Sequence, residues 1–413
     1  MQKDTSADNA SFAGNDLFFY SGTPDKHMFD AADDFGTLAG SYNFAGYAHF
    51  FFNFTFAATA ASIVSGAVAE RCGMWAYFLY SAVLSGFVYP IVAHWVWAQP
   101  GWMCAWNLYE GTSDPLNDVG VVDFAGSGVV HLTGAVAAFC GAFWLGPRRG
   151  RFDETTGEPQ EMPSHSATMQ VLGTFFLWIG WYGFNCGTAF TFAYSAYAFA
   201  AGRIAVTTTL SAASCAITSM AIAYAKKPGE FDLGAINNGA LGGLVSITAG
   251  CATVAPYSAF VIGIIGGFVY HAGSWLMLKC KIDDVVDAIA VHGFCGIWGC
   301  IAAGLFSRGA ELREVYALDE AGAFEAGGDG KLLATSIALV VCIIAWVGTI
   351  MFVFFGSCHF AGILRVSEKE EEDGLDASHH GGPAYNTGDV DVEMAAKQLA
   401  TADPDATTTV SSL

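Results

Sequence analysis

Two histidines lie inside long apolar stretches of the chain: His131 follows VVDFAGSGVV, and His292 follows VDAIAV. An imidazole gains and loses a proton near neutral pH, so a pair of them could hold a proton or pass it on. Ionisable side chains inside apolar helices are costly and usually functional, although a core histidine with satisfied hydrogen bonds is the structural alternative. Burial would favour the neutral form of both rings. A zinc site is a poor alternative, because two histidines without a third ligand do not make a protein zinc site.

Aromatic side chains form the second group of candidate residues. Phe52 and Phe56 stand four residues apart and would therefore share one face of a helix. Trp97 ends the next apolar stretch, and Phe184 lies in the segment WYGFN. Helical periodicity alone would make these rings lipid-facing or core aromatics.

Carboxylates precede both histidines. Asp123 stands at the start of the stretch that contains His131, and Asp287 stands at the start of the stretch that contains His292. Helix capping alone would explain both carboxylates. The two Asp-to-His segments also look like corresponding parts of an inverted repeat, a common plan for transporters that bind their substrate near the middle of the membrane.

The elements that must position these residues are membrane-spanning helices. Of the 413 residues, 54% are hydrophobic and only 13% are charged, which is too apolar for an ordinary soluble domain. A spanning helix needs about 20 mostly apolar residues. Glycine pairs with small-xxx-small spacing, Gly183/Gly187, Gly239/Gly243 and Gly263/Gly267, would let such helices approach closely. The predicted spans are 47–69, 74–97, 124–146, 168–190, 202–225, 236–254, 257–279, 286–307 and 332–360.

The basic residues predict the orientation of these spans. Most arginines and lysines occupy alternate loops, which the positive-inside rule assigns to the cytoplasm. The sequence therefore predicts an outside N-terminus and an inside C-terminus. The predicted organisation is an extracellular acidic segment 1–46, a transmembrane domain 47–364, a cytoplasmic regulatory segment 365–386 and a disordered tail 387–413. The cysteines show no CxxC spacing and are interpreted as buried small hydrophobes, so no metal site or cofactor is predicted.

Four segments together resemble the ammonium transporter family, and the likeness is greatest to its plant-type eukaryotic branch. They are FFFNFTFAATAASIVSGAVAER at 50–71, VVDFAGSGVVH at 121–131, GTFFLWIGWYGFNCGTA at 173–189 and VDAIAVHGFCGIWGC at 286–300. The resemblance runs from about Phe18 to Tyr385. It implies an all-α polytopic fold with an inverted repeat. The family has eleven spanning helices, about nine of which are expected here, so the first two are expected to be missing.

The resemblance also implies roles for single residues. Phe56, Trp97 and Thr188, with Phe52 one turn away, resemble an outer site that recruits ammonium, where ring faces attract a cation by about 0.5–2 kcal/mol. Relatives often carry serine at the position of Thr188. Asp123 is expected to shape this site by holding backbone carbonyls. Phe56 and Phe184 resemble the stacked rings that gate the pore below.

The histidines and the tail complete the resemblance. His131 and His292 look like the family's twin-histidine pair, linked through one ring nitrogen, so that the other nitrogens face the lumen. Ser378 stands where plant relatives carry a phosphorylatable threonine in a regulatory segment.

The implied function is transport of ammonium, or of methylammonium as its analogue, by a homotrimer in the plasma membrane. Ammonium sheds its proton, ammonia crosses the apolar pore, and the proton travels separately or not at all. An ammonium sensor that signals through the tail is the alternative function. No enzymatic motif and no nucleic-acid partner is predicted.

Overall fold

The computed structural model describes residues 44–98, 101–106, 115–191, 196–380 and 382. Most of the predicted segment 1–46 and the whole predicted tail 387–413 lie outside the described residues. The chain divides into two units, Met1–Arg365 and Val366–Leu413.

Among the residues that the structure describes, the first unit is mainly helical, with non-helical connections such as 146–166 and 317–330. Three of its segments are π-helical, η3, η5 and η6, and each continues directly into an α-helix. The elements that frame the candidate site are α1 (Phe44–Val68), α2 (Met74–Val83), η3 (Leu84–Val88), α3 (Tyr89–Trp97), η5 (Ser127–Leu132), α4 (Thr133–Leu145), η6 (Ile289–Phe294) and α9 (Cys295–Phe306). The remaining long elements are α5 (Ala167–Thr191), α6 (Ala196–Lys226), α7 (Leu233–Thr248), α8 (Pro256–Lys279), α10 (Gly309–Tyr316) and α11 (Lys331–Phe360).

Every predicted span coincides with helical structure, within a few residues at most boundaries. Seven stretches among the described residues are both long and apolar enough to cross a membrane. The predicted spans 168–190 and 236–254 are not among these seven. The first corresponds to α5, whose apolar residues are interrupted by Gln170, Asn185 and several glycines, and the second corresponds to α7, which has only 16 residues.

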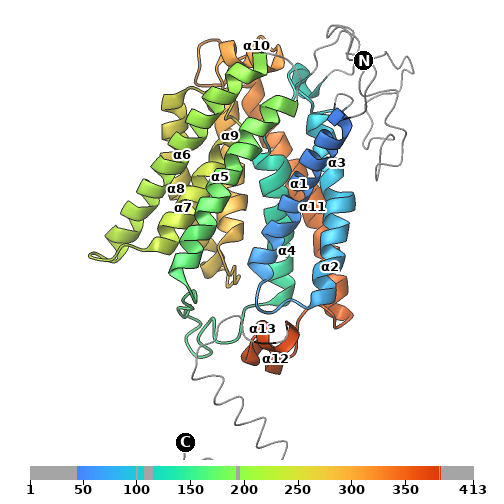
Figure 1. Cartoon of the computed structure of the whole chain (residues 1–413), viewed down its shortest axis with the longest axis vertical. Helices are drawn as coiled ribbons and strands as arrows, with labels where there is room; N and C mark the ends of the chain where they lie inside the picture. Colours follow the sequence, from blue (N-terminus) through green and yellow to red (C-terminus); the bar gives the residue numbers. More distant parts are fainter. Residues whose placement is uncertain (1–43, 99–100, 107–114, 192–195, 381, 383–413) are drawn as a thin grey trace, which may run out of the picture. The chain divides into compact units, whose positions relative to one another are not determined.

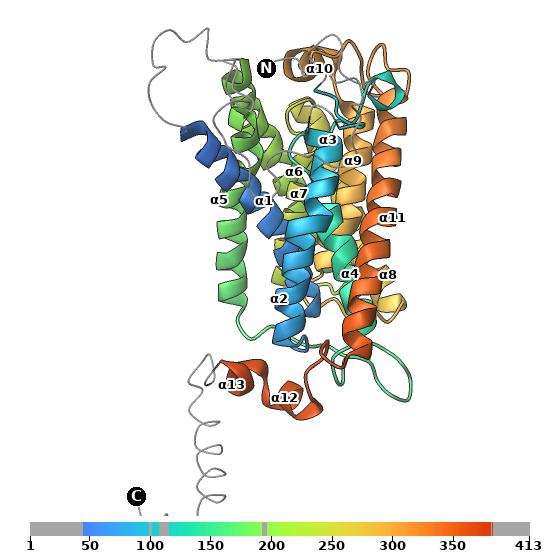
Figure 2. The same cartoon turned by 90° about the vertical axis from the view of Figure 1, so that its right-hand side faces the viewer.

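Two groups of helices make up the first unit (Figures 1 and 2). Helices α5 to α8 pack on one another, and α1 and α11 pack against α4. Contacts of α7 with α9 and of α4 with η6 connect the two groups. The two π-helical segments η5 and η6 contact each other, so the segments that carry the two histidines meet between the groups.

Small residues permit the close packing of α6 with α7 and α8. A Cβ atom added to Gly243 on α7 would lie 2.4 Å from the carbonyl oxygen of Ser211, and one added to Gly263 on α8 would lie 2.2 Å from the same oxygen. The predicted close approach therefore holds for the glycine pairs on α7 and α8. It does not hold for Gly183, where an added Cβ would meet no atom within 4 Å.

In the part of the second unit that the structure describes, there are two short helices, α12 (Glu368–Asp373) and α13 (Leu375–His379). Ser367 begins α12 with a capping box, because its hydroxyl accepts from the Glu370 amide while the Glu370 carboxylate accepts from the Ser367 amide. The Glu370 carboxylate also lies 3.2 Å from Nε2 of His379, which joins the two helices.

Candidate functional site

Aromatic rings from three helices meet at the outer part of the candidate site. Phe52 and Phe56 on α1 lie with ring centroids 4.4 Å apart. The Phe56 ring contacts Trp97, at the end of α3, edge-on at 5.8 Å. It stacks on Phe184 of α5 at 4.0 Å with an interplanar angle of 17°. The structure thus brings together all four aromatics that were singled out in the sequence.

Thr188 lies one turn after Phe184 on α5, and its side chain is buried. Its hydroxyl donates to the carbonyl oxygen of Phe184 at 2.7 Å. Because the proton is used in this bond, the hydroxyl oxygen remains available as an acceptor. This is the property that a site for a hydrogen-bond donor such as ammonium requires.

Asp123 organises the backbone next to the aromatic rings. Its buried carboxylate accepts hydrogen bonds from the amides of Gly126, Gly128 and Val129 at 2.8–3.1 Å. Its own carbonyl oxygen accepts from the indole nitrogen of Trp97 at 2.8 Å. The expectation that Asp123 holds backbone carbonyls was therefore wrong in its detail: a carboxylate is an acceptor and holds amides, and the link to Trp97 runs through the Asp123 main chain.

The two histidines face each other between the helix groups. The rings of His131 and His292 are nearly parallel, with centroids 5.1 Å apart and an interplanar angle of 19°. His131 is buried, with 1% of its surface exposed, whereas His292 is partly exposed.

The expected hydrogen bond between the two imidazoles is absent. Both ring nitrogens of His131 and Nδ1 of His292 have no hydrogen-bond partner among the described residues. The geometry gives the reason. Imidazole nitrogens donate and accept in the plane of the ring, so stacked rings direct them past each other.

The stacked phenylalanines and the histidines form one continuous series of rings, which we call the ring column: Phe56, Phe184, His131 and His292. The His131 ring lies 5.4 Å from that of Phe184, at an angle of 24°. The column is apolar at its outer end and carries titratable nitrogens at its inner end. It is therefore suited to passing a neutral molecule and then exchanging a proton.

Trp181 is a neighbour of the column that the sequence reasoning missed. Its ring stacks on His131 at 4.9 Å and 21°, and its indole nitrogen donates to the Thr248 hydroxyl at 2.9 Å. A signal was present in the sequence, because Trp181 and Phe184 are three residues apart and share one face of α5.

A carboxylate caps each of the segments that carry a histidine. Asp123 precedes His131 by eight residues, and Asp284 precedes His292 by the same number. The Asp284 carboxylate accepts from the amides of Ala288 and Ile289 at 3.0 and 2.6 Å. Both histidines then lie in π-helical segments, a distortion that is frequent at functional sites.

Asp287 does stand at the head of the second segment: its backbone is left-handed (φ 59°), and its carbonyl oxygen accepts from the Val291 amide at 2.8 Å. The helix-capping interpretation of its side chain was wrong, because the carboxylate does not hold the amides of the segment. Its carboxylate accepts instead from the hydroxyls of Tyr270 and Ser274 on α8, at 2.8 and 3.1 Å. The equal Asp-to-His spacing would have identified Asp284 from the sequence alone.

Ser378 lies on α13 in the second unit, and its side chain is exposed. Its hydroxyl donates to the carbonyl oxygen of Gly374 at 2.9 Å. The serine predicted to be regulatory is therefore accessible on a short helix.

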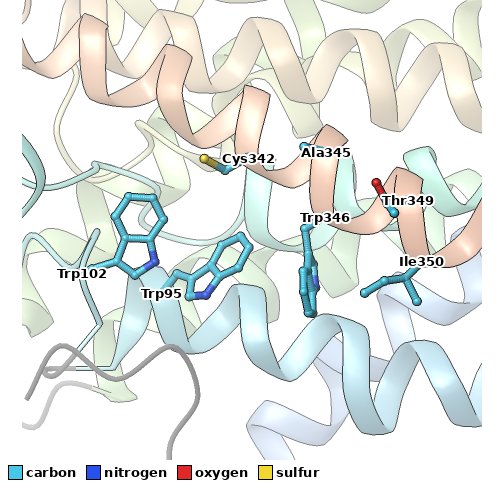
Figure 3. Close-up of a pocket in the computed structure, with 7 residues that line it drawn as sticks. All are labelled: Trp95, Trp102, Cys342, Ala345, Trp346, Thr349 and Ile350. Carbon is cyan, nitrogen blue, oxygen red and sulfur yellow. The ribbon is translucent and has the colours of Figure 1, made fainter.

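A pocket of about 420 Å³ lies apart from the ring column, between α3 and α11. Figure 3 shows three indoles along it, with Trp95 and Trp102 on one side and Trp346 on the α11 side. Its other lining residues are Cys342, Ala345, Thr349 and Ile350. None of the residues predicted to bind or gate the substrate lines it.

The chain is similar to known proteins over most of its length. The model of the Ammonium Transporter Family matches residues 6–385. "Ammonium transporter 1 member 2" of Arabidopsis thaliana is 40% identical over 389 residues, covering 90% of this chain and 74% of the relative. "Ammonium transporter 1 member 1" of Solanum lycopersicum is 42% identical over 352 residues, covering 82% of this chain and 70% of the relative.

Solved structures agree with these matches. A structure named "Sensor Amt Protein" superposes with a TM-score of 0.69 at 32% identity, covering 81% of this chain and 76% of that chain. Candida albicans Mep2 superposes with a TM-score of 0.64 at 28% identity, covering 76% of this chain and 65% of that chain. The family model covers nearly the whole sequence, and the fold agrees with it. The chain therefore belongs to the ammonium transporter family.

Proposed function

We propose that this chain, an ammonium transporter in a membrane, moves its substrate along the ring column from the outer aromatic site to the twin histidines. The observation that carries the proposal is the near-parallel series Phe56, Phe184, His131 and His292, with neighbouring centroids 4.0–5.4 Å apart. Four rings from four helical segments would not align in this way through helix periodicity alone.

Recruitment takes place at the outer end of the column. The faces of Phe52, Phe56 and Trp97 attract a cation, and the Thr188 oxygen accepts a hydrogen bond from it. Asp123 shapes this site through the amides that it holds and through its carbonyl, which orients the Trp97 indole. Its carboxylate is engaged by three amides, so it acts by positioning the site.

The stacked pair of Phe56 and Phe184 acts as the gate. Taking an unpaired ion out of water into an apolar environment costs many kcal/mol, whereas ammonia carries no net charge. Ammonium therefore gives up its proton at the gate to the acceptor that lies next to it, a nitrogen of His131, whose ring is 5.4 Å from that of Phe184, and ammonia passes on. The gate itself carries no free charge, because the Asp123 carboxylate is held by backbone amides and the rings are neutral.

The histidines receive the substrate below the gate. Their unpartnered nitrogens can accept a proton from the substrate or donate one to it, which offers a route for the proton that ammonium releases. Since the two rings stack, a proton is handed from one ring to the other through the substrate or a lumen water rather than through a direct bond.

Location, assembly and regulation are parts of the same proposal. The basic loops support a multi-pass protein in the plasma membrane with its C-terminus in the cytoplasm. The family membership supports a homotrimer with one pore in each subunit. Native mass spectrometry in detergent should then show three copies, and a stable monomer would contradict this assembly. Ser378, exposed on α13, is proposed as the site of regulatory phosphorylation.

One experiment tests the transport function. Oocytes that express the chain are expected to take up labelled methylammonium, and ammonium-evoked current recorded from the same cells reports whether a proton accompanies it. An ammonium sensor would give neither signal. The sensor reading is not favoured, because the family and the curated relatives named above are transporters. Absence of uptake at normal surface expression would refute transport.

A further inference from the structure

A buried ionic cluster lies at the inner ends of the helices that carry the ring column. We call it the inner node; it consists of Glu70, Arg71, Arg148 and Asp283. The node lies outside the segments identified as membrane spans, and no step of the proposed transport mechanism uses it. Two of its members, Arg71 and Asp283, are among the most deeply buried charged residues described, with 0% and 1% exposed.

Asp283 is the acceptor at the centre of the node. Its Oδ2 accepts from Nε of Arg148 at 2.8 Å and from the Arg148 amide at 2.9 Å, and Oδ1 accepts from Nη2 at 3.1 Å. The Arg151 Nε lies 3.3 Å from Oδ1. Bidentate pairs of this kind fix geometry as well as charge. The turn that contains Asp283 is thus held to the loop that follows α4.

Arg71 holds the same turn from the end of α1. Its Nη2 donates to the Asp283 carbonyl at 2.8 Å, and its Nε donates to the Gly146 carbonyl, which ends α4, also at 2.8 Å. Glu70 adds a weaker tie through Nη1 of Arg148 at 2.8 Å, but its own side chain is 61% exposed. The node therefore joins the end of α1, the end of α4 and the turn before η6.

Those three elements lead directly to the ring column. Phe56 lies on α1, and His292 lies in η6. His131 lies in η5, which continues directly into α4. Asp284, the residue after Asp283, caps η6. The turn also packs closely on α1, since a Cβ atom added to Gly66 would lie 2.7 Å from Val286 Cγ2. Neither the turn nor its cap can shift without moving the segment that carries His292.

We infer that Asp283 and Arg148 are positioning residues for the twin histidines. Their ion pair fixes the turn from Asp283 to Asp287, and the turn fixes the direction in which η6 presents the His292 imidazole to His131. This inference rests on the proposed proton exchange at the histidines. A purely structural role for the node is the competing explanation, in which its loss lowers the amount of folded protein and nothing else.

The ratio of ammonium-evoked current to methylammonium uptake separates the two explanations. The amount of folded protein cancels in this ratio, whereas a displaced His292 alters the proton exchange and leaves the apolar path for ammonia. In metal sites, residues that orient a functional histidine are typically worth about 10- to 100-fold in affinity or activity, and a fall of about that lower size is expected here.

Four variants in oocytes form the test. Asp283→Asn removes the charge at the centre of the node, and Arg148→Lys keeps the charge but loses the bidentate geometry; both are expected to lower the current-to-uptake ratio about tenfold. Glu70→Gln removes only the exposed arm and should change the ratio little. The matched control is Glu314→Gln, which breaks the ion pair between Arg203 and Glu314, away from the helices of the ring column, and should leave the ratio unchanged.

A double-mutant cycle with His292 completes the test. If Asp283 acts through His292, adding Asp283→Asn to His292→Leu should not lower the residual methylammonium uptake per copy at the cell surface any further. An unchanged current-to-uptake ratio in Asp283→Asn and Arg148→Lys, or a further fall in that uptake in the His292→Leu background, would overturn the inference. Failure of the proposed transport and failure of this inference give different results in the wild type. Absent uptake refutes transport, and uptake without current refutes the proton relay and this inference with it.

Discussion

Replacing His131 or His292 by leucine should stop the proton-dependent current, while its two effects on the stability of the fold partly cancel. In the structure, His131 has ring contacts with Trp181, Phe184 and His292 at 4.9–5.4 Å. Its two ring nitrogens have no hydrogen-bond partner among the described residues. Leucine removes both features and keeps the site apolar and similar in volume.

The loss of ring contacts and the removal of unpartnered nitrogens change the stability of the fold in opposite directions. Ring pairs contribute about 0.5–1.5 kcal/mol each beyond buried area, so three contacts are worth about 1.5–4.5 kcal/mol. A buried polar group without a partner costs about 1–3 kcal/mol, and leucine removes that cost for at least one nitrogen. The net change for His131→Leu is therefore expected to stay within about 3 kcal/mol of zero. For His292, with one ring contact among those described, it should be smaller.

A third histidine supplies the matched control. His271 lies on α8, and its Nε2 is 2.9 Å from the hydroxyl of Ser219 on α6, so it is a membrane histidine with a satisfied hydrogen bond. His271→Leu loses that bond, worth about 0.5–1.5 kcal/mol, without touching the ring column. It should lower thermal stability modestly and leave current and uptake at wild-type levels.

Three measurements on each variant test this prediction: thermal unfolding in detergent by tryptophan fluorescence, labelled methylammonium uptake, and ammonium-evoked current. His131→Leu, His292→Leu and their double mutant should lose the current and retain part of the uptake. Wild-type current in the double mutant would refute the relay. Loss of current in His271→Leu would show that any membrane histidine gives this result, and the reasoning from unpartnered nitrogens would fail.

Three further predictions follow from single contacts. Burial alone would raise the pKa of Asp283, but the hydrogen bonds from Arg148 and the charge of Arg71 hold it below its usual value of 3.8. The stability that the ionised carboxylate contributes is therefore complete above about pH 4 and is lost as the pH falls through the lower folded-state pKa. Asp283→Asn should make the unfolding temperature depend less on pH when thermal unfolding is recorded below pH 4. Trp181→Leu removes the ring stacked on His131 and should lower the current at equal surface expression, whereas Trp181→Phe should retain more of it. Ser378→Asp adds negative charge to an acidic segment and is expected to lower uptake; unchanged uptake would remove support for regulation at this serine.

Much of the fold could be predicted from apolar run length, because a membrane span must be about 20 mostly apolar residues long. All predicted spans are helical. The same criterion was less suited to α5, whose apolar residues are interrupted by Gln170 and Asn185, and to α7, which has only 16 residues. Three-residue and four-residue spacing likewise placed Phe52 with Phe56 on one face of α1.

Contacts between elements could not be obtained from spacing. The 4.0 Å stack of Phe56 on Phe184 joins α1 to α5, and only the family resemblance predicted it. The resemblance in turn misled on the histidines, whose rings stack and do not share a hydrogen bond. Ring orientation depends on backbone distortion in η5 and η6, which no residue pattern specified.

Several departures from ordinary local structure lie in, or directly before, the segments that carry the two histidines. Both histidines lie in π-helical turns, Asp287 has a left-handed backbone, and His131 is buried without a hydrogen-bond partner among the described residues. Each feature costs free energy that a core built only for stability would avoid. Around them lie well-satisfied groups: Asp123 and Asp284 hold backbone amides, and Arg71 donates to carbonyls of two other segments. A strained site inside a satisfied frame is the arrangement expected where geometry is maintained for chemistry. The frame therefore deserves the same mutational test as the histidines, because a relay that depends on imidazole direction can fail while both imidazoles remain in place.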